Sequence, residues 1–590
     1  MIAEYATLAI YFVVLIILGA VLSRQNKNLS DYVRGGAQGV WWLIGTSMLM
    51  SGISAFTFTG NSSAAFEAGP TMLAIYFANC CGFFVCWLWV GARFRNTRAY
   101  TIVDIVRSRY GTVVEQFTVY AGLLTLPLSA AIQLWALAVF TSSIFQLPLE
   151  PTIVAIGAVV VFYSTSGGRW AVMATDFVQG LVLVPITLLI AFLALKEIGG
   201  VGAFLGYFND PRFAADFTWA KEPGAFPDNK FTWEWIIVIF LMQFIGFVGH
   251  GSAQRFLAAK DGKEAGRGSL LALILMMIGT AAWFIPPMVA RFLYEGEIMA
   301  LDMENPSNAA YAYLATKLLP SGMTGLMIAA MFSATMSSMD TGLNSQTGII
   351  ANNLVPRVRE AMRLPPLSDK ANLILCKTVT VLLGLLLVSY ALLLSQQEEF
   401  RLFDAYLMVQ SVIGLPLALP LLVALYLKKL PRWSFFFIFF VCLIPSIWSM
   451  VDAHFFGESW TIQERAMWIL ISCGLAVLAC RPFYRYSSEK YKAQVESFFR
   501  TMATPVDYMK EVGVSKDYDQ LFIMGNTCLV AGGLLCLLLL GISELWEALC
   551  VFFVTGFVAA IGLLLRKGAA AEKRRAERLL QAASASPFNP

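Results

Sequence analysis

Hydroxyl side chains and one carboxylate interrupt the apolar stretch that runs from residue 321 to 353. At helical spacing, five small or hydroxyl-bearing residues of this stretch fall on one stripe: Ala334, Ser337, Ser338, Thr341 and Ser345. Asp340 falls on the adjoining stripe. In a segment long enough to cross a membrane, such groups are costly unless they face a partner, a cavity or an ion. Because oxygen atoms are the ligands of hard cations, the stretch predicts an ion site.

Two further stretches are too polar for ordinary membrane-spanning helices. Residues 41–68 contain SGISA, where Gly52 and its small neighbours lie at mid-span, so we expect the helix to break there and to turn freed carbonyls toward a ligand. Close helix packing through small residues is the alternative. The run STSGGRWAVMATDFVQG places Asp176 and Gln179 in the first two turns of the next helix. There the alternative is a carboxylate that caps the helix dipole at the membrane edge.

The composition places these stretches in a polytopic membrane protein. Of the 590 residues, 58% are hydrophobic and 14% are charged, against roughly 25% charged residues in soluble domains. The net charge of +4 is small and gives no indication of a nucleic-acid partner. The ten cysteines lie in apolar runs without metal-ligand spacing, and no nucleophile–base pair is apparent. We therefore expect no disulfide framework, no bound cofactor and no enzymatic activity.

Hydropathy predicts fifteen membrane spans, all of them helices. They are residues 2–22, 41–68, 71–92, 113–146, 152–166, 172–196, 232–256, 268–294, 321–353, 371–394, 402–427, 433–453, 464–481, 520–542 and 545–565. If the N-terminus is outside, the outside loops hold only eight Lys and Arg: Lys196, Arg212, Lys221, Lys230, Arg291, Lys317, Arg401 and Arg465. This asymmetry favours an outside N-terminus and an inside C-terminus.

Four separated motifs resemble those of the sodium/solute symporter family over about residues 1–480. They are DYVRGGAQGVWWLIGTSMLMSGISAF, YSTSGGRWAVMATDFVQ, AQRFLAAKDGKEAGRG and AAMFSATMSSMDTGLNSQT. The resemblance implies a five-plus-five inverted-repeat, leucine-transporter-like core in which the first helix of each repeat is broken around the ligands. The repeats would be residues 41–196 and 232–427.

The remaining segments complete the predicted domain organisation. Residues 1–40 would be the first helix and a linker, 197–231 an extracellular loop, and 428–481 two peripheral helices. Residues 482–519 are polar and amphipathic, which predicts a cytoplasmic linker with a helix on the membrane surface. Residues 520–590 would form two extra helices and a basic tail, which is more simply an inside-positive stop than a lipid-binding segment.

Two sodium sites follow from the resemblance. The main site would use the carbonyls of Met50, Ile53 and Ala334 and the hydroxyls of Ser337 and Ser338. These ligands suit Na⁺ without a fixed charge, so binding stays weak enough for release. A second site, present in some relatives, maps to Asp176, Ser337, Asp340 and Thr341. Because Asp340 departs from the all-hydroxyl version of this site, it could bind sodium, bind a proton or do neither.

The substrate pocket is expected beside the helix break, at mid-membrane. Its candidate residues are Thr57, Tyr76, Asn79, Gln243, Phe244, Phe247 and Gln410. Gln410 aligns with a glutamine that sugar-carrying relatives use on their substrate. Thr57 stands where those relatives usually have Gln or His, and no acid matches their pocket glutamate near Tyr76. Ordinary helix packing with a local hydrogen bond is the alternative for each residue.

Together these features predict a sodium-coupled symporter that imports a small organic solute, such as a sugar or an amino acid, by alternating access. It would span the cell (inner or plasma) membrane, with the solute, Na⁺ and lipid as its partners. The sequence does not define the oligomeric state, and a monomer is plausible. The acids Asp176 and Asp340 leave a sodium/proton exchanger open, and they favour two sodiums per cycle over one. A solute sensor on the same fold is a further alternative. A channel is disfavoured because the polar residues cluster at one depth.

Overall fold

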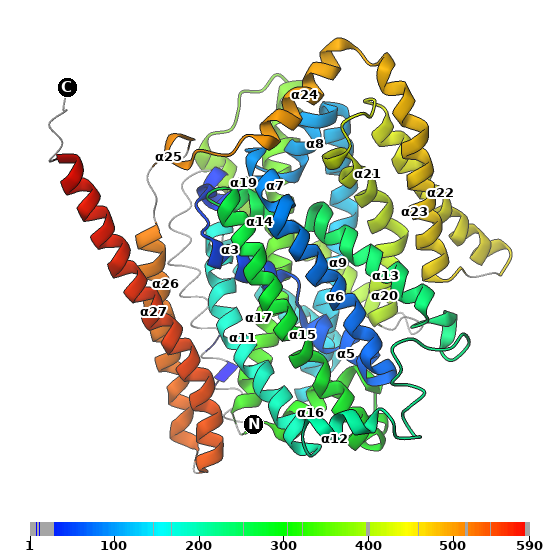
Figure 1. The fold of residues 1–590 in the computed structure, drawn as a ribbon, viewed down its shortest axis with the longest axis vertical. Helices are drawn as coiled ribbons and strands as arrows, with labels where there is room; N and C mark the ends of the chain where they lie inside the picture. Colours follow the sequence, from blue (N-terminus) through cyan, green and yellow to red (C-terminus); the bar gives the residue numbers. More distant parts are fainter. Residues whose placement is uncertain are drawn as a thin grey trace.

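The structure is a computed structural model that describes residues 7–8, 11, 29–145, 147–166, 168–251, 253–303, 305–320, 322–396, 402–457, 460–511, 513, 517–542 and 544–584. Helices are the only regular secondary structure in these ranges, apart from one isolated bridge between Gly39 and Ala259. Almost all of the first predicted span, 2–22, lies outside the described residues. Figure 1 shows the helices gathered into one bundle.

The first half of the bundle begins with a short helix, α2, and a broken one. Its helices are α2 (Leu29–Arg34), α3 (Trp41–Ser51), α4 (Ala55–Phe58), α5 (Gly60–Ala68), α6 (Leu73–Val85), α7 (Gly91–Asn96), α8 (Ile102–Tyr110), α9 (Thr112–Phe145), α10 (Leu149–Ser166) and α11 (Arg169–Glu197). A loop that carries α12 (Val201–Tyr207) leads to the second half.

The second half also begins with an interrupted helix. Its helices are α13 (Trp233–Gly246), α14 (Ala253–Ala258), α15 (Gly262–Met299), α16 (Ala310–Leu318), α17 (Met323–Ile349), α18 (Val355–Ala361), α19 (Asp369–Ser395), α20 (Leu402–Val409) and α21 (Leu415–Tyr426). Then follow α22 (Ser434–Phe455), α23 (Ile462–Cys480), α24 (Glu489–Ala503), α25 (Tyr508–Glu511), α26 (Asp517–Leu535) and α27 (Leu545–Ser584).

Eleven helices of the described part are long and apolar enough to cross a membrane, against fifteen predicted spans. Four predicted spans account for the difference. Span 2–22 lies outside the described residues, 41–68 is divided by its break, and 152–166 forms a shorter apolar helix. The last predicted span, 321–353, corresponds to α17. This helix is long enough to cross a membrane but too polar, since hydroxyls and Asp340 replace apolar side chains. The multi-pass membrane character is confirmed, and the count of fifteen stays a prediction.

The centre of the bundle is formed by α3, α11, α15 and α17, with α15 packed on α3 and α11 packed on α17. Glycine allows the closest approach. A Cβ at Gly45 would lie 2.5 Å from the Gly268 carbonyl oxygen, so α3 and α15 meet backbone to backbone. Both interruptions therefore lie in a tightly packed region, in which a ligand can be held between rigid elements.

The segments after α23 cover the outside of this core. Helix α24 packs on α7 and α8, and Tyr491, Val495, Phe498 and Met502 bury its apolar face. We expected this face to lie on the membrane surface, whereas here the partner is protein. Helices α26 and α27 pair with each other and lie along α11 at one side of the bundle (Figure 1).

Candidate functional site

In the break between α3 and α4, side-chain hydroxyls accept hydrogen bonds from backbone N–H groups. Helix α3 ends at Ser51, and α4 begins at Ala55 after the extended residue Ser54. The Ser54 hydroxyl accepts from the Phe56 amide at 3.3 Å, and the Thr335 hydroxyl of α17 accepts from the Ala55 amide at 2.7 Å. Side chains thus take up N–H groups that the break exposes. The carbonyls of Met50, Ser51 and Ile53 share one side-chain donor, the Ser338 hydroxyl.

Three backbone carbonyls of the break and one of α17 converge on a single hydroxyl, that of Ser338 on α17. Its Oγ lies 2.9 Å from Ile53 O, 3.4 Å from Ser51 O and 3.5 Å from Met50 O. The fourth carbonyl, Ala334 O, is 3.3 Å away. One hydroxyl proton can serve only one of these four acceptors at a time. The cluster is therefore rich in lone pairs and short of protons, which is the environment of a cation site.

Ser337, the preceding residue of α17, points elsewhere. Its hydroxyl is buried beside Asp176 and has no hydrogen-bond partner within the described ranges. Asp176, on α11, accepts a hydrogen bond from Ser47 of α3 through Oδ2, while Oδ1 is unpaired among the described residues. The two serines predicted for one site therefore face two neighbouring groups of oxygens.

Arg255 of α14 lies within the second of these groups. Its Nε donates to Ser47 Oγ at 3.0 Å, and an Nη donates to Thr341 Oγ1 at 2.7 Å. The side chain is buried, at 1% exposure. Because Ser47 accepts from Arg255 and donates to Asp176, one hydroxyl joins the cation to the carboxylate. This arginine was not among the predicted site residues.

The residues predicted for a second sodium are not brought into one shell. Asp340 accepts a hydrogen bond from Ser164 on α10. Thr341, the next residue, accepts a hydrogen bond from Arg255 of α14. Asp176 is linked to Ser47 instead of to either of them. Three of the four predicted residues thus each have a different hydrogen-bond partner, and Ser337 has none among the described residues.

A cavity of about 380 Å³ lies beside the Ser338 cluster. Ser51, Ile53 and Ser338 line it on one side, so the cation cluster opens into it. Its volume falls within the roughly 300–1,000 Å³ of small-molecule sites. Six of the seven predicted pocket residues line it: Thr57, Tyr76, Asn79, Gln243, Phe247 and Gln410. The seventh, Phe244, is not in the lining and stacks on Phe240 with ring centroids 6.4 Å apart.

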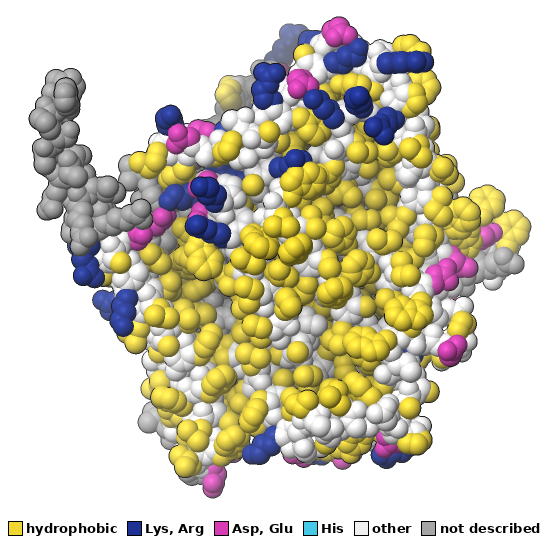
Figure 2. Space-filling view, in the orientation of Figure 1, with side chains coloured by type: hydrophobic (Ala, Val, Ile, Leu, Met, Phe, Trp, Pro, Cys, Tyr) yellow, Lys and Arg dark blue, Asp and Glu magenta, His cyan; other side chains and the backbone are white. Residues whose placement is uncertain are grey.

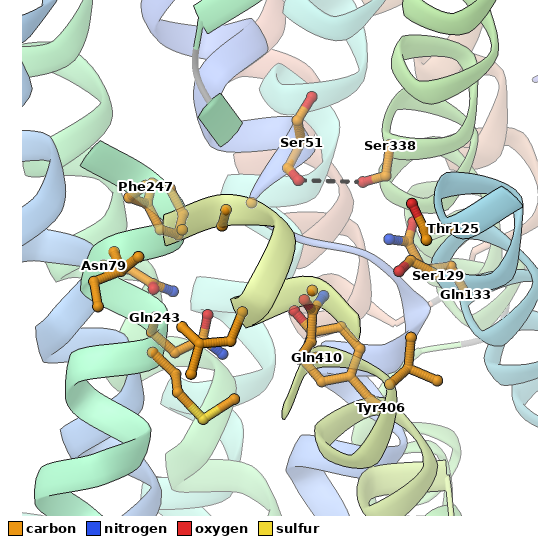
Figure 3. A pocket seen from close by; sticks show the side chains of 18 of the residues that line it. Ser51, Asn79, Thr125, Ser129, Gln133, Gln243, Phe247, Ser338, Tyr406 and Gln410 are labelled. Carbon is orange, nitrogen blue, oxygen red and sulfur yellow. Dashed lines mark hydrogen bonds between the residues drawn. The ribbon is translucent and has the colours of Figure 1, made fainter. Parts of the chain in front are cut away.

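Polar side chains face each other across this cavity. Figure 3 shows Asn79 and Gln243 on one wall and Thr125, Ser129 and Gln133 of α9 on the other, with Gln410 and Tyr406 between them. The amide oxygens of Asn79 and Gln133 are buried and unpaired within the described part. Arg255 is the one charged residue among the described residues of the lining. Apart from Arg255, the described residues of the lining offer neutral hydrogen-bonding groups.

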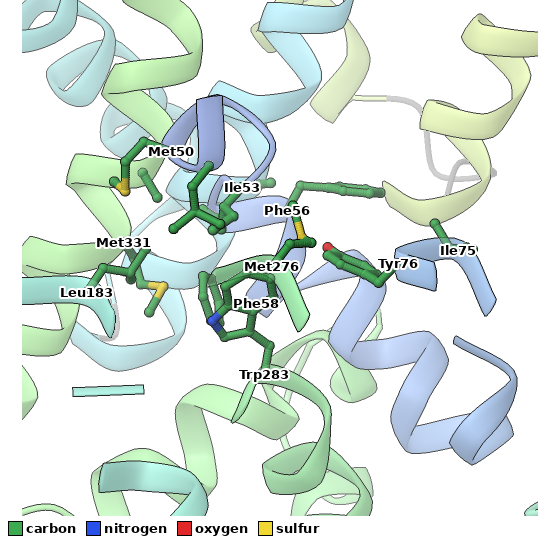
Figure 4. Packing of buried hydrophobic residues seen from close by; sticks show 14 of the residues in the cluster. Met50, Ile53, Phe56, Phe58, Ile75, Tyr76, Leu183, Met276, Trp283 and Met331 are labelled. Carbon is green, nitrogen blue, oxygen red and sulfur yellow. The ribbon is translucent and has the colours of Figure 1, made fainter. Parts of the chain in front are cut away.

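The Tyr76 side chain is fixed in this wall by hydrogen bonds and by ring packing. Its hydroxyl accepts from Asn61 Nδ2 at 2.9 Å and donates to Thr57 Oγ1 at 3.1 Å. Its ring packs edge-on to Phe284 and Trp283, at centroid distances of 4.7 and 5.8 Å. Figure 4 shows Tyr76 and Trp283 below Ile53 of the break. Asn61 was not predicted, although it orients two residues that were.

Gln410 begins a five-residue π-helical turn, Gln410–Gly414, that joins α20 to α21. Its amide and that of Gln243 both lie against the Tyr406 hydroxyl. A Cβ at Gly414 would lie 2.5 Å from Gln410 Oε1, so glycine leaves the space that the amide occupies. A second π turn, Phe247–Gly251, interrupts the helix between α13 and α14. Both wide turns border the cavity and displace the backbone toward it.

The cavity extends from the break toward α8. Ile102 and Val103 of α8 and Leu421 of α21 belong to its lining, whereas no residue of the loop 197–231 does. On the other side, the Phe56 and Tyr406 rings meet at 4.9 Å and lie beside the break. The cavity is therefore displaced toward one end of the bundle.

Residues 32–433 match the model of the sodium:solute symporter family. The sodium/glucose cotransporter 4 of Danio rerio is 24% identical over 485 residues, covering 77% of this chain and 72% of that protein. The sodium/myo-inositol cotransporter 2 of Oryctolagus cuniculus is 24% identical over 471 residues, covering 72% of this chain and 66% of that protein.

Solved structures show a similar fold. A Na⁺-coupled sialic acid symporter, in a substrate-bound outward-open state, has a TM-score of 0.68 at 19% identity and covers 82% of this chain and 98% of its own. A nucleobase-cation-symport-1 family transporter with bound bromovinylhydantoin has a TM-score of 0.51 at 14% identity, covering 80% and 99%. At these identities the likeness concerns the fold alone.

Proposed function

The chain belongs to the sodium:solute symporter family, and we propose that it carries a small neutral organic solute together with Na⁺ by alternating access. Na⁺-coupled solute transport follows from the family. The ion site, the solute class and the conformational cycle are our proposals, built on the described residues.

The observation that carries the ion site is the convergence of four carbonyls on Ser338 Oγ. Na⁺ has nearly the radius of Ca²⁺, which holds oxygen ligands at roughly 2.3–2.6 Å. Neighbouring ligands on an octahedral shell of that radius lie about 3.3–3.7 Å apart. Three of the four distances, to Met50, Ser51 and Ala334, are 3.3–3.5 Å. The main sodium would thus bind Ser338 and the carbonyls of Met50, Ile53 and Ala334, with Ser51 O as an additional candidate.

Ser337 is the least supported member of the proposed main site. Its hydroxyl lies beside Asp176, and it would have to turn toward the carbonyls to ligate the same ion. The proposal therefore rests on Ser338 and the backbone oxygens. Since none of these groups carries a charge, the ion would be held weakly enough to leave during each cycle.

The lining of the cavity supports a neutral solute with several hydroxyl groups. Amide and hydroxyl side chains can each donate or accept, which suits groups that do both. Two of the amide oxygens, on Asn79 and Gln133, have no partner among described residues and so are available to a solute hydroxyl. Relatives named for glucose and myo-inositol transport agree with this chemistry. Gln410, Gln243 and Asn79 would then contact the solute.

Coupling of Na⁺ binding to the solute pocket would follow because the oxygens that ligate the ion belong to two different elements. Met50 and Ile53 lie at the break of the α3–α4 helix, whereas Ala334 and Ser338 lie on α17. An ion bound to both would hold the break against α17 and so fix the wall that also carries Thr57. Loss of the ion into the adjoining cavity would release that wall. The displacement of the cavity toward α8 supports a conformation that faces the cytoplasm.

We place the α8 end in the cytoplasm because of its charge. Figure 2 shows Lys and Arg side chains gathered at the end of the bundle that carries α24 and α8, with few at the opposite end. Cytoplasmic loops of membrane proteins carry such an excess. This agrees with an outside N-terminus and an inside C-terminus. We further propose two inverted repeats, at 41–196 and 232–427, and a location in the cell membrane.

The test is solute-dependent Na⁺ current in proteoliposomes. Purified protein would be screened with neutral polyols, acidic sugars and amino acids under an inward Na⁺ gradient, with choline replacing Na⁺ as the control. A current that needs both Na⁺ and a neutral polyol supports the proposal. Selective transport of an acidic solute would refute the solute class. Na⁺ flux that follows a pH gradient without any organic solute would favour the sodium/proton exchanger instead.

A further inference from the structure

Arg255 occupies the place at which a second sodium would be expected. Its guanidinium bridges Ser47 of α3 and Thr341 of α17, with donor–acceptor distances of 3.0 and 2.7 Å. We propose that Arg255 is a built-in cation that takes the role of a second sodium, so that one Na⁺ binds per transport cycle. The proposal rests on the proposed sodium-coupled function, and it names a residue outside the main sodium site.

The oxygen atoms near Asp176 are largely committed to this arginine. Thr341 Oγ1 and Ser47 Oγ accept hydrogen bonds from the guanidinium, and the Ser47 hydroxyl donates its own proton to Asp176 Oδ2. Asp176 Oδ1 and Ser337 Oγ are the unpaired oxygens left beside them among the described residues. Hard cations take roughly six oxygen ligands. Two free oxygens are too few for a second sodium while Arg255 remains in place.

The charges give the same result. Two arginines, Arg169 and Arg255, and two aspartates, Asp176 and Asp340, are buried on α11, α14 and α17, each at 3% exposure or less. Their formal charges cancel, so Asp176 has no need of a second sodium as a counter-ion. Asp176 is connected to Arg255 through the Ser47 hydroxyl, and intramembrane acids are tolerated where a cation lies nearby.

Arg169 adds a further positive charge on the same helix as Asp176. Its Nε donates to Val33 O at 3.3 Å, while both terminal nitrogens are buried without a partner within the described part. Asp176 follows two helical turns later on α11, on the same face. A second sodium would therefore enter a region whose two carboxylate charges are already balanced by two fixed guanidinium charges.

The test counts bound sodium without requiring the solute. Equilibrium binding of ²²Na⁺ to purified, monodisperse protein should give one ion per parent molecule, and Ser338→Ala should weaken the affinity roughly 5- to 13-fold. Arg255→Ala opens the oxygens of Ser47, Thr341 and Asp176, so it should bind two ions. Arg255→Lys keeps the charge and should bind one. The double variant Arg255→Ala with Asp176→Asn should return to one.

The outcomes separate this inference from the proposed function. A parent that binds two ions, one of which is lost in Asp176→Asn, would overturn the inference and leave sodium coupling intact. Arg255→Ala that remains at one ion, in a folded protein, would overturn it as well. If Arg255→Ala does not fold, Asp176→Asn decides alone, because an unchanged count of one supports the inference. A parent that binds no Na⁺ contradicts the proposed function and this inference together.

Discussion

Ser338→Ala tests the proposed sodium site with the smallest change to the fold. The variant removes the one side-chain oxygen that contacts Met50, Ile53 and Ala334, and it leaves the carbonyls in place. A hydroxyl bonded to a charged group contributes about 1.5–3 kcal/mol. Against this, the hydroxyl already donates to Ile53 O at 2.9 Å, a neutral bond of about 0.5–1.5 kcal/mol that the ion would displace.

The difference of about 1–1.5 kcal/mol corresponds to a roughly 5- to 13-fold weaker Na⁺ affinity. The assay is the Na⁺ concentration that half-saturates ²²Na⁺ binding, or that gives half of the Na⁺-dependent shift in Tm. Ser345→Ala is the matched control, because it removes a half-buried hydroxyl two turns further along α17. An unchanged Na⁺ midpoint in Ser338→Ala would refute the site. An equal shift in Ser345→Ala would show that the effect is not local.

Three further predictions concern the pocket, the break and the linker that carries α24 and α25. Gln410→Ala should raise the half-saturating solute concentration in transport assays while leaving ²²Na⁺ binding nearly intact; loss of Na⁺ binding alone would mean that the pocket is misplaced. Thr335→Val leaves the Ala55 amide without its acceptor, so the unpaired buried donor should lower the free energy of unfolding by about 1–3 kcal/mol. The variant should therefore have a lower Tm, and an unchanged Tm would contradict this role. Hydrogen bonds from Arg98 lower the pKa of Glu511 below its ordinary 4.5, so this contact is complete above that pH and is lost as the pH falls through the lowered value. Glu511→Gln should therefore speed hydrogen exchange in α25 at neutral pH, and equal exchange in variant and parent would contradict it.

The sequence was most informative where local chemistry conflicts with the membrane. Gly52 and its small neighbours predicted a break, and the structure ends α3 at Ser51 and starts α4 at Ala55. Helical spacing on α17 predicted that Ser338 and Ala334 share a stripe, and both oxygens lie in the carbonyl cluster. Such features are readable because a polar group at mid-span is costly unless a partner, a cavity or an ion receives it.

Arg255 could not be recognised in the same way. It lies near the end of a predicted span, and Lys or Arg at such positions usually marks the cytoplasmic side of the membrane. Only the packing of α14 against α3 turns this side chain inward to Ser47. The spacing of Asp176, Asp340 and Thr341 in the sequence did not predict that a guanidinium lies among them. Neighbours from another part of the chain decided the chemistry of this site.

The apolar face of α24 illustrates a second limit. Its pattern of buried residues is the same whether the apolar partner is a bilayer or another helix. Asn96 Nδ2 donates to Met502 O at 3.1 Å, and Arg98 makes two hydrogen bonds of 2.7 Å to Glu511. These polar contacts tie the linker to α7 and the following loop. Periodicity predicts the face of a helix but does not identify what covers it.

The number of sodium ions sets how far the protein can concentrate its solute. One Na⁺ that enters down a tenfold gradient and about 100 mV releases roughly 1.4 + 2.3 = 3.7 kcal/mol, which supports an accumulation of about 500-fold for a neutral solute. Two ions would square that limit. If Arg255 supplies the second charge permanently, the transporter works at the lower limit. It then spends one sodium ion per solute molecule instead of two.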